Sequence, residues 1–118
     1  MEGFAEMQLP LLEYLDLSRN GIGESLNFMR AFSSLKGLCL SDCQLREKDL
    51  LVLTHAHFPR LHLLELSNYS LTSDNNKVSD SGIEHLSRMQ TLRELYLKET
   101  GMSARGVEKL MELELVHL

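Results

Sequence analysis

Three histidines stand close together in the segment HAHFPRLH, at positions 55, 57 and 62. Imidazole is a common zinc ligand, but zinc takes four ligands in a tetrahedral set, and no cysteine or carboxylate stands at a suitable spacing nearby. A histidine at the end of a helix interacts favourably with the helix dipole, which explains these residues without a metal. We therefore predict no metal site and no cofactor at His55, His57 or His62.

The segment DNNKVSDSG, which begins at Asp74, has some of the acidic and amide side chains of a calcium loop. Counted from Asp74, the glycine that such a loop requires falls at Ser79, and the bidentate glutamate falls at His85. The pattern therefore fails as a calcium site. We predict instead that residues 72–81 are a polar insertion in a surface loop, either a tolerated insertion or a binding loop at the rim of the fold.

Neither cysteine is placed for catalysis. Cys39 and Cys43 are separated by roughly 13 Å of chain if the segment is extended, which is too far for a disulfide. Nucleophilic chemistry needs a group that lowers the thiol pKa, and no histidine or basic residue is expected beside Cys39. The NGIG segment at Asn20 is a turn and not a phosphate-binding loop. We predict that the chain is not an enzyme.

Composition limits the partners and the compartment. The 118 residues carry a net charge of -5, which disfavours nucleic acid and anionic membranes as targets. The start MEGFAEMQLP does not read as a signal peptide, and no apolar stretch reaches the length of a membrane span. The sequon at Asn68 is therefore expected to be unused. An intracellular location, cytoplasmic or nuclear, is the expectation.

Four segments that can position side chains share one pattern of apolar residues. They are LEYLDLSRNGI from Leu12, LKGLCLSDCQL from Leu35, LHLLELSNYSL from Leu61 and LRELYLKETGM from Leu92. Alternate leucines in each LxxLxL part predict a short strand with one buried face. Apolar residues at helical spacing follow, as in KDLLVLTHAHF, and Ser79 and Ser103 are suitable N-caps for the last two helices. One strand and one helix cannot bury their apolar sides alone, so the units must stack.

These units resemble the leucine-rich repeat family, and the segment VSDSGIEHLSRMQTLRELYL is similar to its ribonuclease-inhibitor-like or cysteine-containing subclass. The resemblance implies a right-handed α/β solenoid, or horseshoe, of four to five repeats. Its parallel strands would line the concave face and its helices the convex face. One domain would span residues 1–118, with partial units at 1–11 and 110–118. The family's ladder position, whose side chain bonds the backbone of the turn, would hold Asn20, Cys43, Thr100 and an inward Tyr69.

The family is a protein-binding one, so the resemblance implies a protein-protein interaction module or scaffold. If the leucines point inward, the residues between and just after them form an exposed strand face that is mainly acidic. Such a face would attract a basic peptide or protein, with the tyrosines and Leu63 as anchors; the alternative is a solvated face that keeps the chain soluble. The predicted partner-binding residues are Tyr14, Asp16, Arg19, Asp42, Leu63, Glu65, Glu94, Tyr96, Lys98 and Glu99.

Two other functions fit the same pattern. The chain could be an assembly piece that self-associates or stacks through uncapped ends, at residues 1–10 and 112–118, because an apolar last strand is an unpaired edge. It could also be the repeat portion of a larger regulatory protein, of the ubiquitin-ligase substrate receptor or GTPase regulator type. Both types use repeats of this subclass, but the sequence contains no accompanying effector motif.

Overall fold

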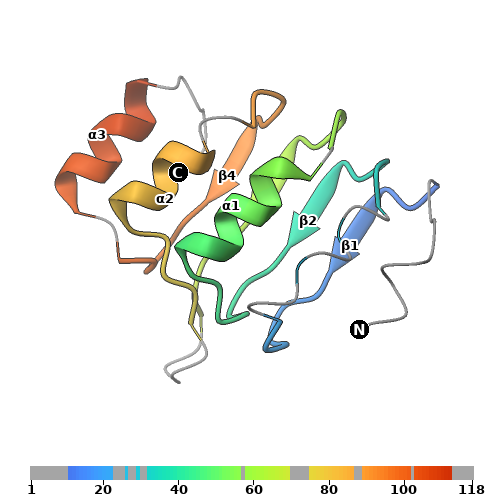
Figure 1. Cartoon of the computed structure of the whole chain (residues 1–118), viewed down its shortest axis with the longest axis horizontal. Coiled ribbons are helices and arrows are strands. Elements are labelled where there is room, and N and C mark those ends of the chain that lie inside the picture. The colour runs from blue at the N-terminus through green and yellow to red at the C-terminus, as the bar shows by residue number, and fades with distance from the viewer. Residues whose placement is uncertain are drawn as a thin grey trace.

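A computed structural model describes residues 11–22, 26, 29, 32–56, 58–69, 75–86, 89–101 and 103–112, and the side chains of the last range as far as residue 108. In this part of the chain, strands and helices alternate from β2 onward (Figure 1). The strands are β1 (Tyr14–Asp16), β2 (Gly37–Cys39), β3 (Leu63–Glu65) and β4 (Glu94–Tyr96). The helices are α1 (Glu47–His55), α2 (Ser79–Leu86) and α3 (Ala104–Glu112).

The described strands form one parallel sheet in the order β1-β2-β3-β4. Their register places the central leucines of the repeats side by side. Backbone hydrogen bonds continue past the strand ends, as from Leu40 N to Glu65 O at 2.8 Å and from Leu66 N to Tyr96 O at 2.9 Å. The prediction of an α/β repeat fold with parallel strands is confirmed for the described residues. The aligned leucines are Leu15, Leu38, Leu64 and Leu95.

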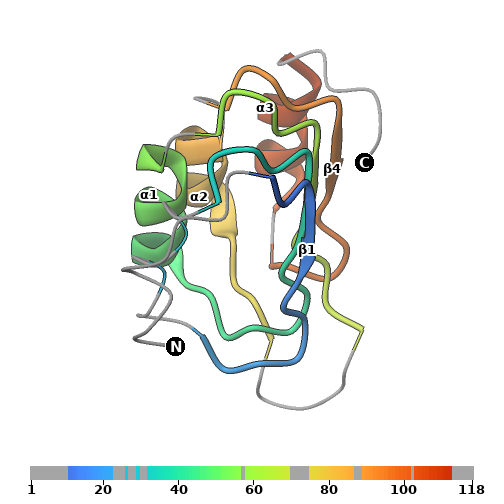
Figure 2. The ribbon, with the colours of Figure 1, turned by 90° about the vertical axis from the view of Figure 1, so that its right-hand side faces the viewer.

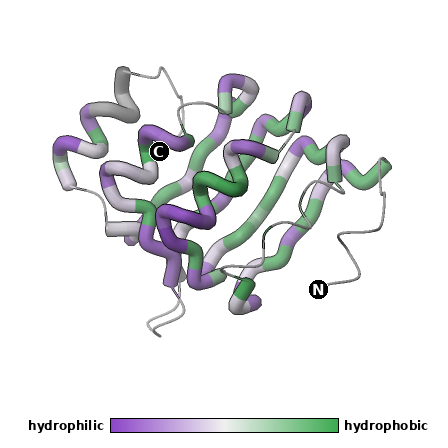
Figure 3. Tube along the Cα trace, in the orientation of Figure 1, coloured by the Kyte–Doolittle hydropathy of each residue, from purple (hydrophilic) through white to green (hydrophobic). Residues whose placement is uncertain are grey.

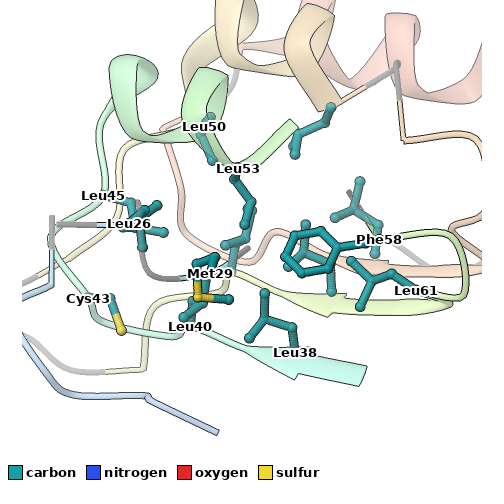
Figure 4. Close-up of a cluster of buried hydrophobic side chains, with 14 of the residues drawn as sticks. Leu26, Met29, Leu38, Leu40, Cys43, Leu45, Leu50, Leu53, Phe58 and Leu61 are labelled. Carbon is teal, nitrogen blue, oxygen red and sulfur yellow. The ribbon is translucent and has the colours of Figure 1, made fainter. Parts of the chain in front are cut away.

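The described helices lie against one face of the sheet, and none of them covers the other face, here called the uncovered face (Figure 2). Leucines of the strands and of α1 meet between the two layers (Figure 4), where Leu38, Leu64 and Leu53 are completely buried. The first turn of α1 is hydrophilic and its middle is hydrophobic (Figure 3). Leu50 and Leu53, three residues apart on one side of the helix, are buried, as expected for a helix that packs one side on a core. The strand residues next to these leucines must therefore point to the uncovered face, since side chains alternate along a strand.

The first repeat is less buried than the others. Leu15 and Leu17 are only half-buried, whereas their counterparts Leu38 and Leu40 are fully buried. Leu11, which precedes β1, is 91% exposed. Among the described strands, β1 lies at one edge of the sheet and therefore has a neighbour on only one side.

Three of the four predicted ladder residues bond the turns of the repeats. Asn20 donates from Nδ2 to Leu17 O at 2.8 Å. Thr100 donates to Leu97 O at 2.8 Å, and Cys43 Sγ lies 3.2 Å from Leu17 O. These side chains satisfy carbonyls where the strand turns away, so the family's ladder prediction is confirmed at Asn20, Cys43 and Thr100.

In the third repeat the prediction of an inward Tyr69 is wrong, and Asn76 holds the ladder position. Asn76 is 1% exposed. Its Nδ2 donates to Leu40 O at 2.7 Å and to Leu66 O at 2.9 Å. Its Oδ1 accepts from the backbone amides of Cys43 at 3.1 Å and Leu45 at 3.0 Å. One side chain therefore joins the second repeat to the third through four hydrogen bonds.

Asn68 and Asn76 close the neck of the insertion. Asn76 N donates to Asn68 Oδ1 at 2.7 Å, and Asn68 Nδ2 donates to Asn76 O at 2.8 Å and to Glu99 O at 2.8 Å. The prediction of a polar surface loop over residues 72–81 is therefore wrong for its second half, where Asn76 and Val78 are buried; residues 72–74 lie outside the described residues. Burial and these bonds also make Asn68 unsuitable for glycosylation.

The predicted N-cap of α3 is confirmed, whereas Ser79 is the first residue of α2 and its Oγ lies 3.2 Å from Ser81 Oγ. Ser103 Oγ accepts from Gly106 N at 3.3 Å, which satisfies one of the amides that a helix leaves unpaired in its first turn. The same hydroxyl donates to Asp80 Oδ2 at 2.5 Å, so the cap also ties α3 to α2.

Candidate functional site

The uncovered sheet face presents two rows of side chains across the four strands. The first row runs in register through Tyr14, Gly37, Leu63 and Glu94. The second row runs through Asp16, Cys39, Glu65 and Tyr96. The structure therefore brings together, on one surface, the strand residues of the predicted binding face.

The exposure of the predicted partner-binding residues separates them into three groups. Exposed residues are Tyr14, Asp16, Arg19, Lys98 and Glu99. Half-buried residues, all on β3 and β4, are Leu63, Glu65, Glu94 and Tyr96. Asp42 alone is buried.

Asp42 cannot contact a partner, and its place on the predicted binding face is a correction. The side chain is 2% exposed, and Oδ2 accepts a hydrogen bond from Tyr69 N at 3.1 Å. Asp42 has a φ of 52°, and Arg19 and Glu99 share this left-handed backbone with φ of 65° and 59°. These three residues stand in the turns after the strands, where the alternation of a strand no longer predicts which way a side chain points.

Two carboxylates of the second row are held by backbone amides two residues further on. Ser18 N donates to Asp16 Oδ1 at 2.9 Å, and Ser67 N donates to Glu65 Oε1 at 2.9 Å. Hydrogen bonds from the Ser18 side chain and backbone hold the pKa of Asp16 below its usual value. Both carboxylates therefore have a defined orientation on the outer face.

Tyr69 lies on the same face, although it was not among the predicted binding residues. It is 57% exposed, and its hydroxyl donates to Glu65 Oε2 at 2.9 Å. This hydrogen bond raises the pKa of the Tyr69 phenol. The sequence contains a signal for the alternative ladder residue. Asn76-Lys77-Val78 matches the NxL end of the family pattern, with valine in place of leucine, directly before the next helix.

Tyr14 leans over β2. A Cβ atom added to Gly37 would lie 2.8 Å from Tyr14 Cδ1, so the ring occupies the space that any larger residue at position 37 would need. Glycine at position 37 therefore allows the 70% exposed Tyr14 to lie along the sheet surface.

Cys39 lies in the second row between Asp16 and Glu65. Burial raises its pKa, and the negative charges of Asp16 and Glu65 raise it further. Less thiolate is then present at neutral pH, and the thiolate is the reactive form. This environment opposes nucleophilic chemistry at Cys39.

We expect iodoacetamide to alkylate Cys39 several-fold more slowly at neutral pH than it alkylates a cysteine in an unstructured peptide. The double variant Asp16→Asn/Glu65→Gln should react faster than the wild type, because the pKa of Cys39 falls when the neighbouring charges are removed. Peptide mapping by mass spectrometry measures the rate at each cysteine. Glu94→Gln, on the first row, is the control, and an equal acceleration there would contradict the assignment of the effect to the two neighbours.

The charge on the face is smaller than the sequence suggested. Asp42 is buried, and the side chains of residues 112 and 114 lie outside the described residues. The acidic groups that remain are Asp16, Glu65 and Glu94 on the strands and Glu99 in a turn. Lys36, at the start of β2, is paired with Glu13, and this contact raises the pKa of Lys36.

The histidines do not assemble a site in the described residues. His55 is the last residue of α1 and is exposed, in agreement with the expected helix end; His62 precedes β3, and His57 lies outside the described residues. Within the described ranges no group of three or more potential ligands has the geometry of a metal site. No helix in the same ranges is long and apolar enough to cross a membrane.

The parallel sheet, its helices on one face and the leucines repeated in register define an α/β repeat protein. A family model described as Leucine Rich repeat matches residues 8–25, which include β1, and residues 88–111, which include β4 and most of α3. These matches support a leucine-rich repeat family, whose repeats generally mediate protein-protein interactions and which is typically non-catalytic. Searches of curated proteins and of solved structures gave no match to the chain.

Proposed function

We propose that the chain is a protein-interaction module that binds a basic polypeptide on the two rows of the uncovered sheet face. The observation that supports the proposal is the composition of those rows. Tyr14, Leu63 and Tyr96 offer apolar contact area, and Asp16 and Glu65 lie between them with oriented carboxylates. Aromatic anchors commonly dominate binding energy, and complementary charge increases specificity and the association rate.

The proposal includes the arrangement of the repeats. The four described repeats would belong to one right-handed solenoid domain over residues 1–118, with the sheet on its concave side. Consecutive pairing of β1 to β4 and helices on one face are the features that support this arrangement. The proposal also includes the ribonuclease-inhibitor-like subclass, on the basis of the sequence of residues 78–97.

The test is a selection of peptides from a random phage-displayed library on the wild-type chain, with two matched triple variants for comparison. The face variant is Asp16→Asn/Glu65→Gln/Glu94→Gln. The helix variant carries the same change in charge on exposed residues of the three helices, as Glu47→Gln/Glu84→Gln/Glu108→Gln.

We expect selected peptides to be rich in lysine and arginine and to bind the face variant about tenfold more weakly, because exposed ion pairs contribute about 0.2–1 kcal/mol each. The helix variant should retain wild-type affinity. Fluorescence anisotropy measures both affinities, and added salt should weaken wild-type binding. Equal losses in the two variants would show a general effect of net charge and would refute binding on the strand face.

End-to-end assembly is a second candidate, supported by the incomplete burial at β1. Leu15 and Leu17 are half-buried and Leu11 is 91% exposed, so a further strand or a second chain at this edge would remove apolar surface from water. Substitutions on the strand face distinguish this candidate, because they should not change self-association. Under it, the mass measured by light scattering would rise with concentration equally in the wild type and in the face variant.

A further inference from the structure

We propose that Tyr14, Asp16, Cys39, Glu65 and Tyr69, here called the Cys39 cluster, form a recognition site for an arginine side chain of the partner. The inference rests on the proposed function and specifies which residue of a basic polypeptide the face selects. Its basis is the position of Tyr69, which the insertion removes from the ladder and places beside the second row.

Tyr69 is held at two points. Its backbone amide donates to Oδ2 of the buried Asp42 at 3.1 Å, and its hydroxyl donates to Glu65 Oε2 at 2.9 Å. Asn76 performs the ladder function of the third repeat, so Tyr69 has no role in the core and is 57% exposed. An exposed aromatic ring with fixed backbone and hydroxyl loses little conformational entropy on binding, which favours its use as a contact.

Two carboxylates face each other across Cys39. Asp16 and Glu65 lie on β1 and β3, which are separated by β2, so their backbones are roughly 10 Å apart at the usual strand spacing. Asp16 and Glu65 each stand opposite Cys39 in the strand register, and their charges raise the pKa of its thiol. Within the described residues, neither carboxylate forms an ion pair with a lysine or arginine.

Guanidinium fits this arrangement better than ammonium. It is planar and weakly hydrated, it stacks on aromatic rings, and its five N–H donors reach carboxylates on more than one side. Tyr69 and Tyr14 supply the rings, and the free lone pairs of the Asp16 and Glu65 oxygens supply the acceptors. The thiol of Cys39 is small, and the Tyr14 ring lies flat over Gly37 at one side of the cluster. A lysine ammonium would neutralise the charge, but it would not stack on the tyrosine rings or donate to both carboxylates from one plane.

The experiment is a titration of the isotopically labelled full chain with three capped single residues: N-acetyl-arginine methylamide, its lysine counterpart and its neutral citrulline counterpart. Two-dimensional NMR follows the backbone amides. We expect the arginine probe to shift the amides of Cys39, Glu65 and Tyr69 and to bind at least threefold more tightly than the lysine probe. The citrulline probe should cause no shift at these amides. Equal binding of the arginine and lysine probes would overturn the proposal.

A matched pair of substitutions tests the aromatic contribution. Tyr69→Ala should weaken binding of the arginine probe at least fivefold, whereas Val52→Ala, at an exposed apolar residue of α1 away from the strand face, should leave that binding unchanged. Asp16→Asn and Glu65→Gln should each weaken binding of the arginine probe as well. Thermal unfolding of each variant confirms that it is folded. Retained arginine binding in folded Tyr69→Ala would also overturn the proposal.

The two proposals fail in different ways. If phage-selected peptides lose affinity in the face variant but bind Tyr69→Ala as tightly as the wild type, the Cys39 cluster is wrong and the face remains the binding site. If the arginine probe binds the cluster, but the selected peptides bind the face variant as tightly as the wild type, the arginine site stands and the proposed function fails.

Discussion

Asn76→Ala is expected to remove roughly 4 kcal/mol or more of folding stability, since each buried backbone group left without a partner costs about 1–3 kcal/mol. Four such groups lose their partner: the carbonyls of Leu40 and Leu66 and the amides of Cys43 and Leu45. Water cannot easily replace the side chain, because Asn76 is 1% exposed. Small domains are stable by only about 5–15 kcal/mol, so the variant should be close to unfolded.

Denaturant unfolding followed by circular dichroism measures this loss. Asn75→Ala is the matched control, because it is the same substitution at the adjacent residue. Asn75 contributes its backbone carbonyl, which accepts from Arg46 Nη1 at 2.8 Å, and this carbonyl survives the substitution. The control should therefore lose less than about 1 kcal/mol, the usual size of effects outside the core. Similar losses in the two variants would mean that Asn76 is not the ladder residue of the third repeat.

Leu64→Asp is expected to abolish cooperative folding. Leu64 is completely buried on β3, between Leu38 of β2 and Leu95 of β4. The substitution removes a buried leucine, at a cost of about 2–5 kcal/mol. It also places a carboxyl group where no polar partner is available, at a further cost of several kcal/mol, unless the group takes up a proton. The sum matches or exceeds the stability of a small domain.

The adjacent residue provides the control for Leu64→Asp. Leu63 belongs to the same strand but points to the uncovered face, so Leu63→Asp makes the same chemical change at a half-buried position. We expect a loss of no more than about 1 kcal/mol, because the carboxylate reaches water, which screens it from the like charges of Glu94 across the strands and of Glu65 on the same strand. Heat denaturation of both variants, monitored by circular dichroism, decides the matter. If Leu63→Asp unfolds while Leu64→Asp stays folded, the buried and outward faces of the strand are the reverse of those described.

The two predictions test different kinds of information. The orientation of Leu64 follows from alternation along a strand of a few residues, which any correct sequence pattern contains. The role of Asn76 follows from bonds to Leu40 and Leu66, residues far away in the chain. Measuring both separates what the repeat pattern dictates locally from what folding assembles.

The sequence alone determined the strands, their order and the division into buried and outward residues. The reason is local: leucines at alternate positions bury one side of each strand, and stacking then places Leu38, Leu64 and Leu95 side by side. Tyr14, Asp16, Leu63 and Glu65 were assigned to the outer face for the same reason.

Only the tertiary structure decided which residue serves the turn of the third repeat and how the face is completed. The insertion moves the ladder position of the third repeat from Tyr69 to Asn76, because buried carbonyls and amides of two repeats require an amide side chain between them. Tyr69 is thereby released to Glu65 on the outer face, and Asp42 is buried against the Tyr69 backbone. Counting at the regular repeat spacing puts Tyr69 on the ladder. The choice of Asn76 over Tyr69 depends on hydrogen bonds between residues that the insertion brings together in the folded chain.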